Sequence, residues 1–163
     1  MKFSILITLF FISLFLSAQI KPTLSFKVDQ ANNIRIDHLD NIYLFNKTTI
    51  DKYNTNGNKI ATYSNNQLGD ISKIDISNPL KVLVLHKDQN TLEILDNTLS
   101  TERNTTLDLT NANLYNTSVF AYSSIDNGIW FYDRELFQII KVDLTMNRIY
   151  ESGNLLQILG LET

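Results

Sequence analysis

The chain has 163 residues, no cysteine and a formal net charge of −3. This slight acidic excess, without a basic run, argues against non-specific binding to nucleic acid or to an anionic membrane surface. Without cysteine, we expect neither disulfides nor a lipid anchor on an N-terminal cysteine.

Residues 1–18 have the layout of a secretory signal peptide. A short positive region at Met1–Lys2 precedes residues 3–16, which are almost wholly apolar. This core is too short to anchor in a bilayer of about 30 Å, and small residues follow it directly. We expect cleavage near Ala18 or Gln19, and the rival interpretation is an uncleaved N-terminal anchor. The predicted location is therefore periplasmic, outer-membrane-associated or secreted.

The sequence after residue 18 is consistent in length with one domain and is rich in polar turns. Removing Lys2 with the leader leaves 13 basic and 17 acidic residues, and no apolar stretch of membrane-spanning length remains. Asparagine is common, at 19 residues, and clusters in segments such as Asn54–Asn58 and Asn111–Asn113. Because Asn tolerates left-handed backbone and forms side-chain turns, these segments are typical of loops between short strands. The predicted class is all-β.

Strand-length runs bounded by Asn, Asp, Gly or Ser recur along the chain, as expected for antiparallel strands joined by tight turns. Only two prolines and few long helical periods accompany them. After a lead-in strand within residues 19–33, the expected strands are Ile34–Ile36, Ile42–Phe45, Ile50–Tyr53, Ile60–Tyr63, Ile71–Ile76, Val82–Leu85, Leu92–Leu95, Ser118–Ser123, Ile129–Tyr132, Phe137–Leu144 and Arg148–Glu151.

Three of these runs are apolar at every position and align with one another: Ile42–Phe45, Val82–Leu85 and Ile129–Tyr132. Their equivalent residues Leu44, Val84 and Phe131 recur after 40 and 47 residues, a spacing typical of a four-stranded propeller blade. Strands apolar on both faces are expected to be buried on both, as inner strands between neighbouring blades are. The alternative is a β-sandwich of irregular strands.

The segment Asp126–Asp133 places a turn before an aromatic inner strand, and this element recurs. On these features, residues 34–151 resemble bacterial extracytoplasmic β-propeller proteins, broadly the WD40-like, NHL-like and YVTN-like group. No Gly-His/Trp-Asp pair, kelch double glycine or Tyr-Val-Thr-Asn occurs, so no single family is indicated. The resemblance implies about three four-stranded antiparallel blades, at about 34–66, 67–110 and 111–153.

Three blades cannot close a ring, because propellers have about four to eight. Residues 154–163 are strongly apolar without a polar cap and are expected to begin a further blade. We therefore expect an incomplete propeller, the N-terminal part of a longer one. The alternative is a ring completed by self-association with another copy through open blade edges.

Neither histidine has the spacing of a metal site. No His-x-Glu, His-Glu-x-x-His or paired-histidine pattern surrounds His38 or His86, so both are interpreted as ordinary surface or strand-edge residues. Segment 37–41 resembles a calcium loop only faintly, because the glycine and distal glutamate of that pattern are absent. We expect no metal or cofactor.

Two acidic pairs have the residue types of acid–base catalysts: Asp37/Asp40 and Asp133/Glu135. Because they follow or precede strands beside turn residues, Asx turns explain them without catalysis. No Gly-x-Ser-x-Gly element or glycine-rich phosphate loop occurs. Residues 130–132, Trp-Phe-Tyr, are interpreted as packing of an inner strand rather than as a ligand platform. No catalytic residue is assigned.

These observations favour an exported, non-catalytic binding or scaffold protein of the bacterial envelope, which presents its loops to a protein or glycan partner. The alternative is an envelope enzyme, a hydrolase or lyase, whose catalytic site is completed by further blades.

Overall fold

The computed structural model describes residues 25, 27, 31–115, 117–122 and 125–161. The predicted signal peptide at 1–18, its cleavage positions Ala18 and Gln19, and most of the lead-in segment 19–33 lie outside the described residues. Within the described part, no helix is long and apolar enough to cross a bilayer.

Twelve strands form three four-stranded antiparallel sheets, and in each sheet the strands lie in chain order. The first blade contains β1 (Asn33–Ile36), β2 (Ile42–Phe45), β3 (Thr49–Tyr53) and β4 (Lys59–Ser64). The second contains β5 (Ile71–Asp75), β6 (Val82–His86), β7 (Thr91–Leu95) and β8 (Thr101–Asp108). The third contains β9 (Thr117–Tyr122), β10 (Ile129–Asp133), β11 (Gln138–Val142) and β12 (Arg148–Glu151). The short helices are η1 (Lys87–Gln89), η2 (Leu109–Ala112) and α2 (Leu155–Ile158).

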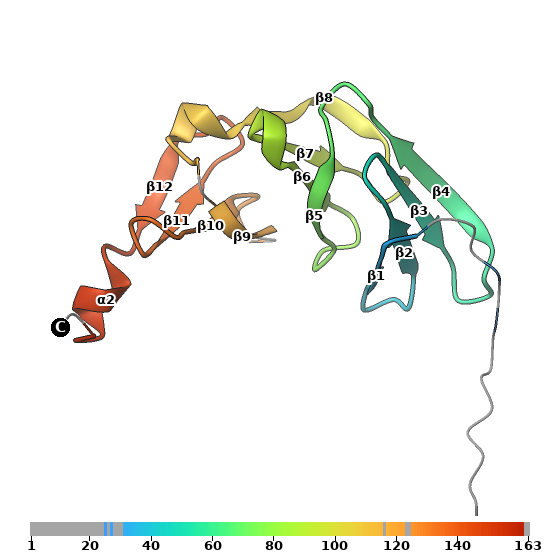
Figure 1. Ribbon diagram of the computed structural model, residues 1–163, viewed down its shortest axis with the longest axis horizontal. Helices are drawn as coiled ribbons and strands as arrows, with labels where there is room; N and C mark the ends of the chain where they lie inside the picture. The colour runs from blue at the N-terminus through green and yellow to red at the C-terminus, as the bar shows by residue number, and fades with distance from the viewer. Residues whose placement is uncertain (1–24, 26, 28–30, 116, 123–124, 162–163) are drawn as a thin grey trace, which may run out of the picture.

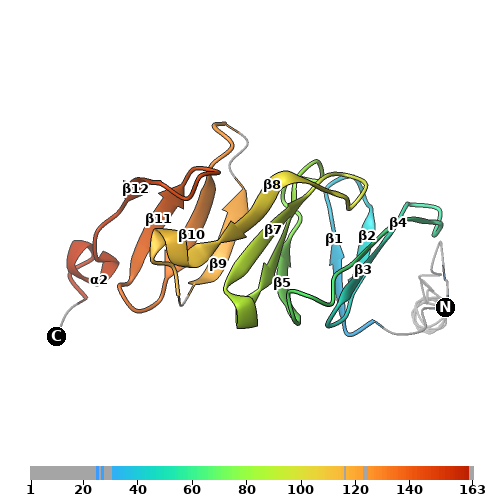
Figure 2. The ribbon, with the colours of Figure 1, turned by 90° about the horizontal axis from the view of Figure 1, so that it is seen from above.

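The sheets stand side by side along an open arc. Figure 1 shows the first strand of each sheet on the concave side and the fourth strand on the convex side. Seen from above, the three sheets follow one another along the long axis in chain order (Figure 2). The first strands β5 and β9 of neighbouring blades contact each other. The all-β class and the three antiparallel blades of an incomplete propeller are thereby confirmed.

The second blade is buried on both faces because a neighbour covers each one. All five residues of β6 are buried. Val82 and Val84 belong to an apolar cluster shared with the first blade, and Leu83 and Leu85 belong to a second cluster shared with the third blade. Side chains alternate across a strand, so a continuous apolar run serves two interfaces at once. This packing explains why β6 is apolar at every position.

One turn geometry recurs at four hairpins. In each, the Oδ1 atom of an Asp or Asn accepts hydrogen bonds from the backbone amides two and four residues later, and the residue three positions on has positive φ. The four turns are 37–41, 54–58, 96–100 and 143–147. In the second and third blades the positive-φ residue is Leu99 or Met146, whose buried side chain packs into the interface with the preceding blade.

The structure differs from the expected strands in two places. Strand β8 was not expected, because Leu107 is its only large apolar residue; its inward positions are filled by Thr105 and Leu107. Helix α2 stands where a further blade was expected to begin. Asn154 caps this helix, since its Oδ1 atom accepts from the amides of Leu156 and Gln157. The described part of 154–161 therefore begins with a helical turn rather than a strand.

The two-sided packing predicts a large cost for truncating the middle strand. Leu83→Ala removes a fully buried side chain and should lower the free energy of unfolding by about 2–5 kcal/mol. Urea denaturation measures this change. The control Leu80→Ala removes a side chain that is 61% exposed and should cost less than about 0.5 kcal/mol. Equal costs for the two variants would contradict the packing described.

Candidate functional site

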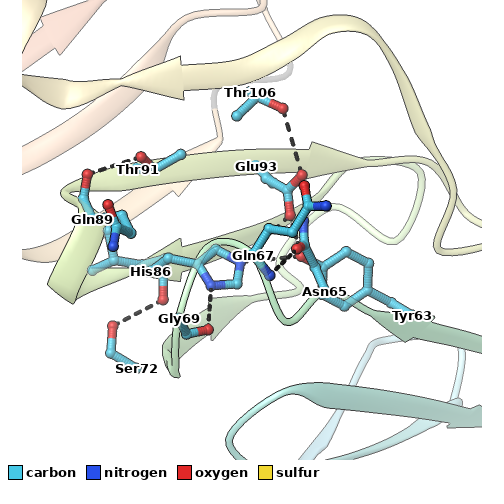
Figure 3. A network of polar contacts seen from close by, with 11 residues as sticks. Tyr63, Asn65, Gln67, Gly69, Ser72, His86, Gln89, Thr91, Glu93 and Thr106 are labelled. Carbon is cyan, nitrogen blue, oxygen red and sulfur yellow. Dashed lines mark hydrogen bonds and ion pairs between the residues drawn. The ribbon is translucent and has the colours of Figure 1, made fainter.

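A polar cluster is buried at the junction of the first and second blades (Figure 3). Tyr63 reaches it from β4, His86 from the end of β6 and Glu93 from β7. The Tyr63 hydroxyl donates to Glu93 Oε2, and His86 Nε2 lies 3.1 Å from that hydroxyl and 3.4 Å from the same carboxylate oxygen. His86 Nδ1 lies 3.2 Å from the Gly69 carbonyl. The cluster thus links three strands of two blades.

His86 corrects the sequence analysis, which interpreted it as an ordinary surface or strand-edge residue. It does end its strand, yet its side chain is fully buried. The residue before it, Leu85, faces the third blade, so alternation turns His86 toward the first blade. There it contacts Tyr63 of β4, next to Glu93 of its own blade. His38 is exposed, as expected. No sequence spacing joined His86 to Tyr63 and Glu93, because they come from three separate strands.

The polar side chains of the cluster are all hydrogen-bonded, and Glu93 is ionised. Burial raises the pKa of Glu93, but hydrogen bonds from His86 and Tyr63 outweigh it and keep the pKa below its usual value. Burial and the Glu93 carboxylate raise the pKa of Tyr63 far above its usual range, so its hydroxyl remains a donor. Within the described residues, no buried side-chain N or O atom lacks a hydrogen-bond partner. Such a network stabilises one packing of the two blades.

A polar cavity of about 340 Å³ opens beside this cluster. Its lining combines hydroxyls with the edge of the cluster: Thr62, Tyr63, Ser64, Asn65, Glu93, Leu99, Ser100 and Thr101. Glu93 is only 3% exposed, and Tyr63 and Thr106 already occupy its oxygens. The cavity therefore offers a small polar ligand hydroxyl groups rather than an available base.

A second cleft, of about 350 Å³, lies at the junction of the second and third blades. It is lined by Ser72, Lys73, Leu85, Lys87, Thr117, Arg134 and Glu135. Lys87 lies in η1 directly after β6, and Arg134 lies in the turn after β10. The Asp133 carboxylate fixes that turn by accepting from the amides of Glu135 and Leu136. Three cationic side chains, two hydroxyls and one carboxylate thus line the same cleft.

The acidic pairs have the structural roles expected of them. Asp37 accepts from the amides of Leu39 and Asn41 and from the Tyr43 hydroxyl, and Asp40 occupies the positive-φ position of that turn. Asp133 holds the turn that contains Glu135. Asx turns therefore account for the carboxylates of Asp37 and Asp133.

The aromatic run at 130–132 divides between two faces. Phe131 is buried against the second blade, whereas Trp130 and Tyr132 are partly exposed on the opposite face. The packing role is correct for Phe131. Across the described residues, no group of three His, Asp or Glu side chains is placed to hold a metal ion.

The ionised Glu93 predicts an acid-sensitive junction. Its pKa is lower in the folded chain than in the unfolded one, so its contribution is present above about pH 4.3 and is lost as the pH falls through the lowered native pKa. Glu93→Gln should therefore be less stable than the parent at pH 7, and the difference should shrink below about pH 4. Urea denaturation across this range measures it. The exposed control Glu102→Gln should show little difference at either pH, and a pH-independent loss for Glu93→Gln would contradict this account.

Comparison with known proteins supports the fold. No protein-family model matches the chain, and no curated protein matches its sequence. Among solved structures, a streptogramin B lyase is 16% identical with a TM-score of 0.52, covering 77% of this chain and 41% of the lyase. A catalytically inactive histidine-to-alanine variant of virginiamycin B lyase from Staphylococcus aureus, with quinupristin, is 14% identical with a TM-score of 0.53, covering 78% of this chain and 42% of the lyase.

A third similar structure is a protein of unknown function from Bacteroides caccae. It is 13% identical with a TM-score of 0.51, and the match covers 74% of this chain and 48% of that protein. The chain therefore spans less than half the length of each of these structures. At such low identity the likeness concerns the fold alone. The described residues have the fold of an incomplete β-propeller of three four-stranded blades.

Proposed function

We propose that the chain is an exported, non-catalytic propeller protein of the bacterial envelope that binds a carboxylate-bearing partner, glycan or protein. One observation carries this proposal: the cleft between the second and third blades gathers Lys73, Lys87 and Arg134 on adjoining strands and loops. In propellers and other repeat folds, loops at one end of the repeats commonly form the binding surface. The layout of residues 1–18 supports export.

The chemistry of the cleft suits a carboxylate. The guanidinium of Arg134 offers paired donors, and the ammonium groups of Lys73 and Lys87 add positive charge in a chain that is acidic overall. The hydroxyls of Ser72 and Thr117 line the same cleft, although Ser72 already donates to the Leu85 carbonyl. The Glu135 carboxylate, which lines the same cleft, disfavours an anionic ligand with high charge density. A partner with spaced carboxylates fits this arrangement better than one with a dense phosphate cluster.

The acid–base groups of the described residues support a non-catalytic role. His86 and Glu93 are enclosed at a blade junction, and the carboxylates of Asp37 and Asp133 hold turns. An enzyme needs a base within hydrogen-bond reach of its substrate, and these groups are committed to protein partners.

Binding should depend on the cationic side chains of the cleft. Replacing Lys87 and Arg134 together by Gln should weaken binding of polygalacturonate or polyglutamate by on the order of tenfold to a hundredfold, and added salt should weaken parent binding. Isothermal titration calorimetry measures both effects. Lys47→Gln is the matched control, because Lys47 is an exposed lysine outside the cleft, paired with Asp70. Equal affinity for the double variant and the control would overturn the proposal.

The second candidate function is a lyase-type enzyme, and one observation favours it. The polar cavity is lined by Tyr63 and the Glu93 carboxylate, which His86 contacts from behind the lining, and two structures with the same fold are lyases. Turnover of quinupristin by the chain, abolished by Glu93→Gln but not by Glu102→Gln, would establish this function instead.

A further inference from the structure

Two blades of this chain present the same side chains on the same face. We define the front face of a blade as the face that is directed toward the following blade. On the first blade, the central strands place Tyr43, Phe45, Ile50 and Lys52 on this face. Strand register assigns the equivalent positions of the third blade to Trp130, Tyr132, Ile139 and Lys141. Both faces thus carry two aromatic residues, an isoleucine and a lysine in the same positions.

The second blade shows what such a face binds. Tyr43, Phe45 and Ile50 are buried against the β5, β6 and β7 side chains of the second blade. Lys52 lies over the Tyr43 ring at 5.2 Å and donates across the interface to the Asn97 carbonyl at 2.9 Å. Asn97 is the second residue of the turn 96–100. A blade with this front face therefore takes the back face of another blade, together with the carbonyl of its Asx turn.

The third blade carries the same lysine–aromatic arrangement, and among the described residues no further blade covers it. Lys141 lies over the Trp130 ring at 4.6 Å, and Asp126 of the same blade is its ion-pair partner. Trp130 also meets the Tyr150 ring edge-on at 5.5 Å. Trp130 also lines an apolar groove of about 370 Å³, together with Ala121, Tyr132 and Ile139. Ile139 remains 37% exposed, whereas Ile50 at the equivalent position of the covered first blade is 0% exposed.

The back face of the first blade has the matching chemistry. Ile34 and Ile36 of β1 pair with Leu44 and Ile42 of β2, and these four side chains share the face opposite to Tyr43. Ile34 and Ile36 are 55% and 60% exposed. The adjoining turn 54–58 has the geometry of turn 96–100, which makes the Thr55 carbonyl equivalent to the Asn97 carbonyl.

We propose that the front face of the third blade docks the back face of the first blade of a second copy of this chain. Trp130, Tyr132 and Ile139 pack on Ile34 and Ile36 of the partner copy, and Lys141 moves from Asp126 to the Thr55 carbonyl. Because the two faces differ, the contact is head-to-tail, and its repetition closes a ring or extends a filament. This surface is separate from the cationic cleft, so the inference does not depend on the proposed function.

The absence of native cysteine makes crosslinking a clean test. Two single variants of the full chain, Lys141→Cys and Thr55→Cys, are purified separately, mixed and treated with a short bis-maleimide. The mixture should give on the order of tenfold more covalent dimer than either variant alone, as measured on a denaturing gel. A chain carrying both Lys52→Cys and Asn97→Cys should close internally and remain a monomer, which calibrates the reach of the reagent.

Two further measurements keep the proposal falsifiable. Adding Trp130→Glu or Tyr132→Glu to the Lys141→Cys chain should reduce the dimer yield, while circular dichroism shows that each variant is folded. Light scattering of the parent chain should show a mass that rises with concentration. The proposal is wrong if the mixture crosslinks no better than Lys141→Cys mixed with Leu80→Cys. It is also wrong if the parent stays a monomer at every concentration.

Discussion

Burial of both faces of the central strands is the constraint on which the rest of this structure depends. A four-stranded blade has two broad faces, and each must be covered to remove its apolar side chains from water. In the second blade, β6 satisfies both demands with one apolar run, since alternate residues enter the clusters shared with the first and third blades. The arc, the repeated turns and the positions of Leu99 and Met146 follow from stacking blades in this way.

The two polar sites of the described residues lie at blade junctions. The Tyr63–His86–Glu93 cluster and its polar cavity lie between the first two blades, and the cationic cleft lies between the second and third. Junctions bring together side chains that are distant in sequence while each blade supplies a rigid sheet. The same geometry gives the chain two different roles for polar groups: enclosed groups fix the packing, and groups at the ends of the blades remain accessible to a partner.

The sequence was sufficient to predict the class, the blade spacing and most strands, because the apolar runs and Asn- or Asp-rich turns are local signals. It predicted the turn roles of Asp37 and Asp133 for the same reason. Strand β8 was not predicted because its β-forming residues are threonines, and Leu107 is the only large apolar residue in it. The burial of His86 was not predicted because it depends on residues from three strands. The two cavities were not predicted because residues from different blades form them, and no sequence spacing connects these residues.

Native-state hydrogen exchange followed by mass spectrometry tests the central claim most directly. If two covered faces protect the middle blade, amides of β6 and β7 should exchange most slowly, near the rate of global unfolding, and those of β1 and β12 much faster. Slower exchange in β1 or β12 than in β6, or uniform exchange across the three blades, would contradict the account.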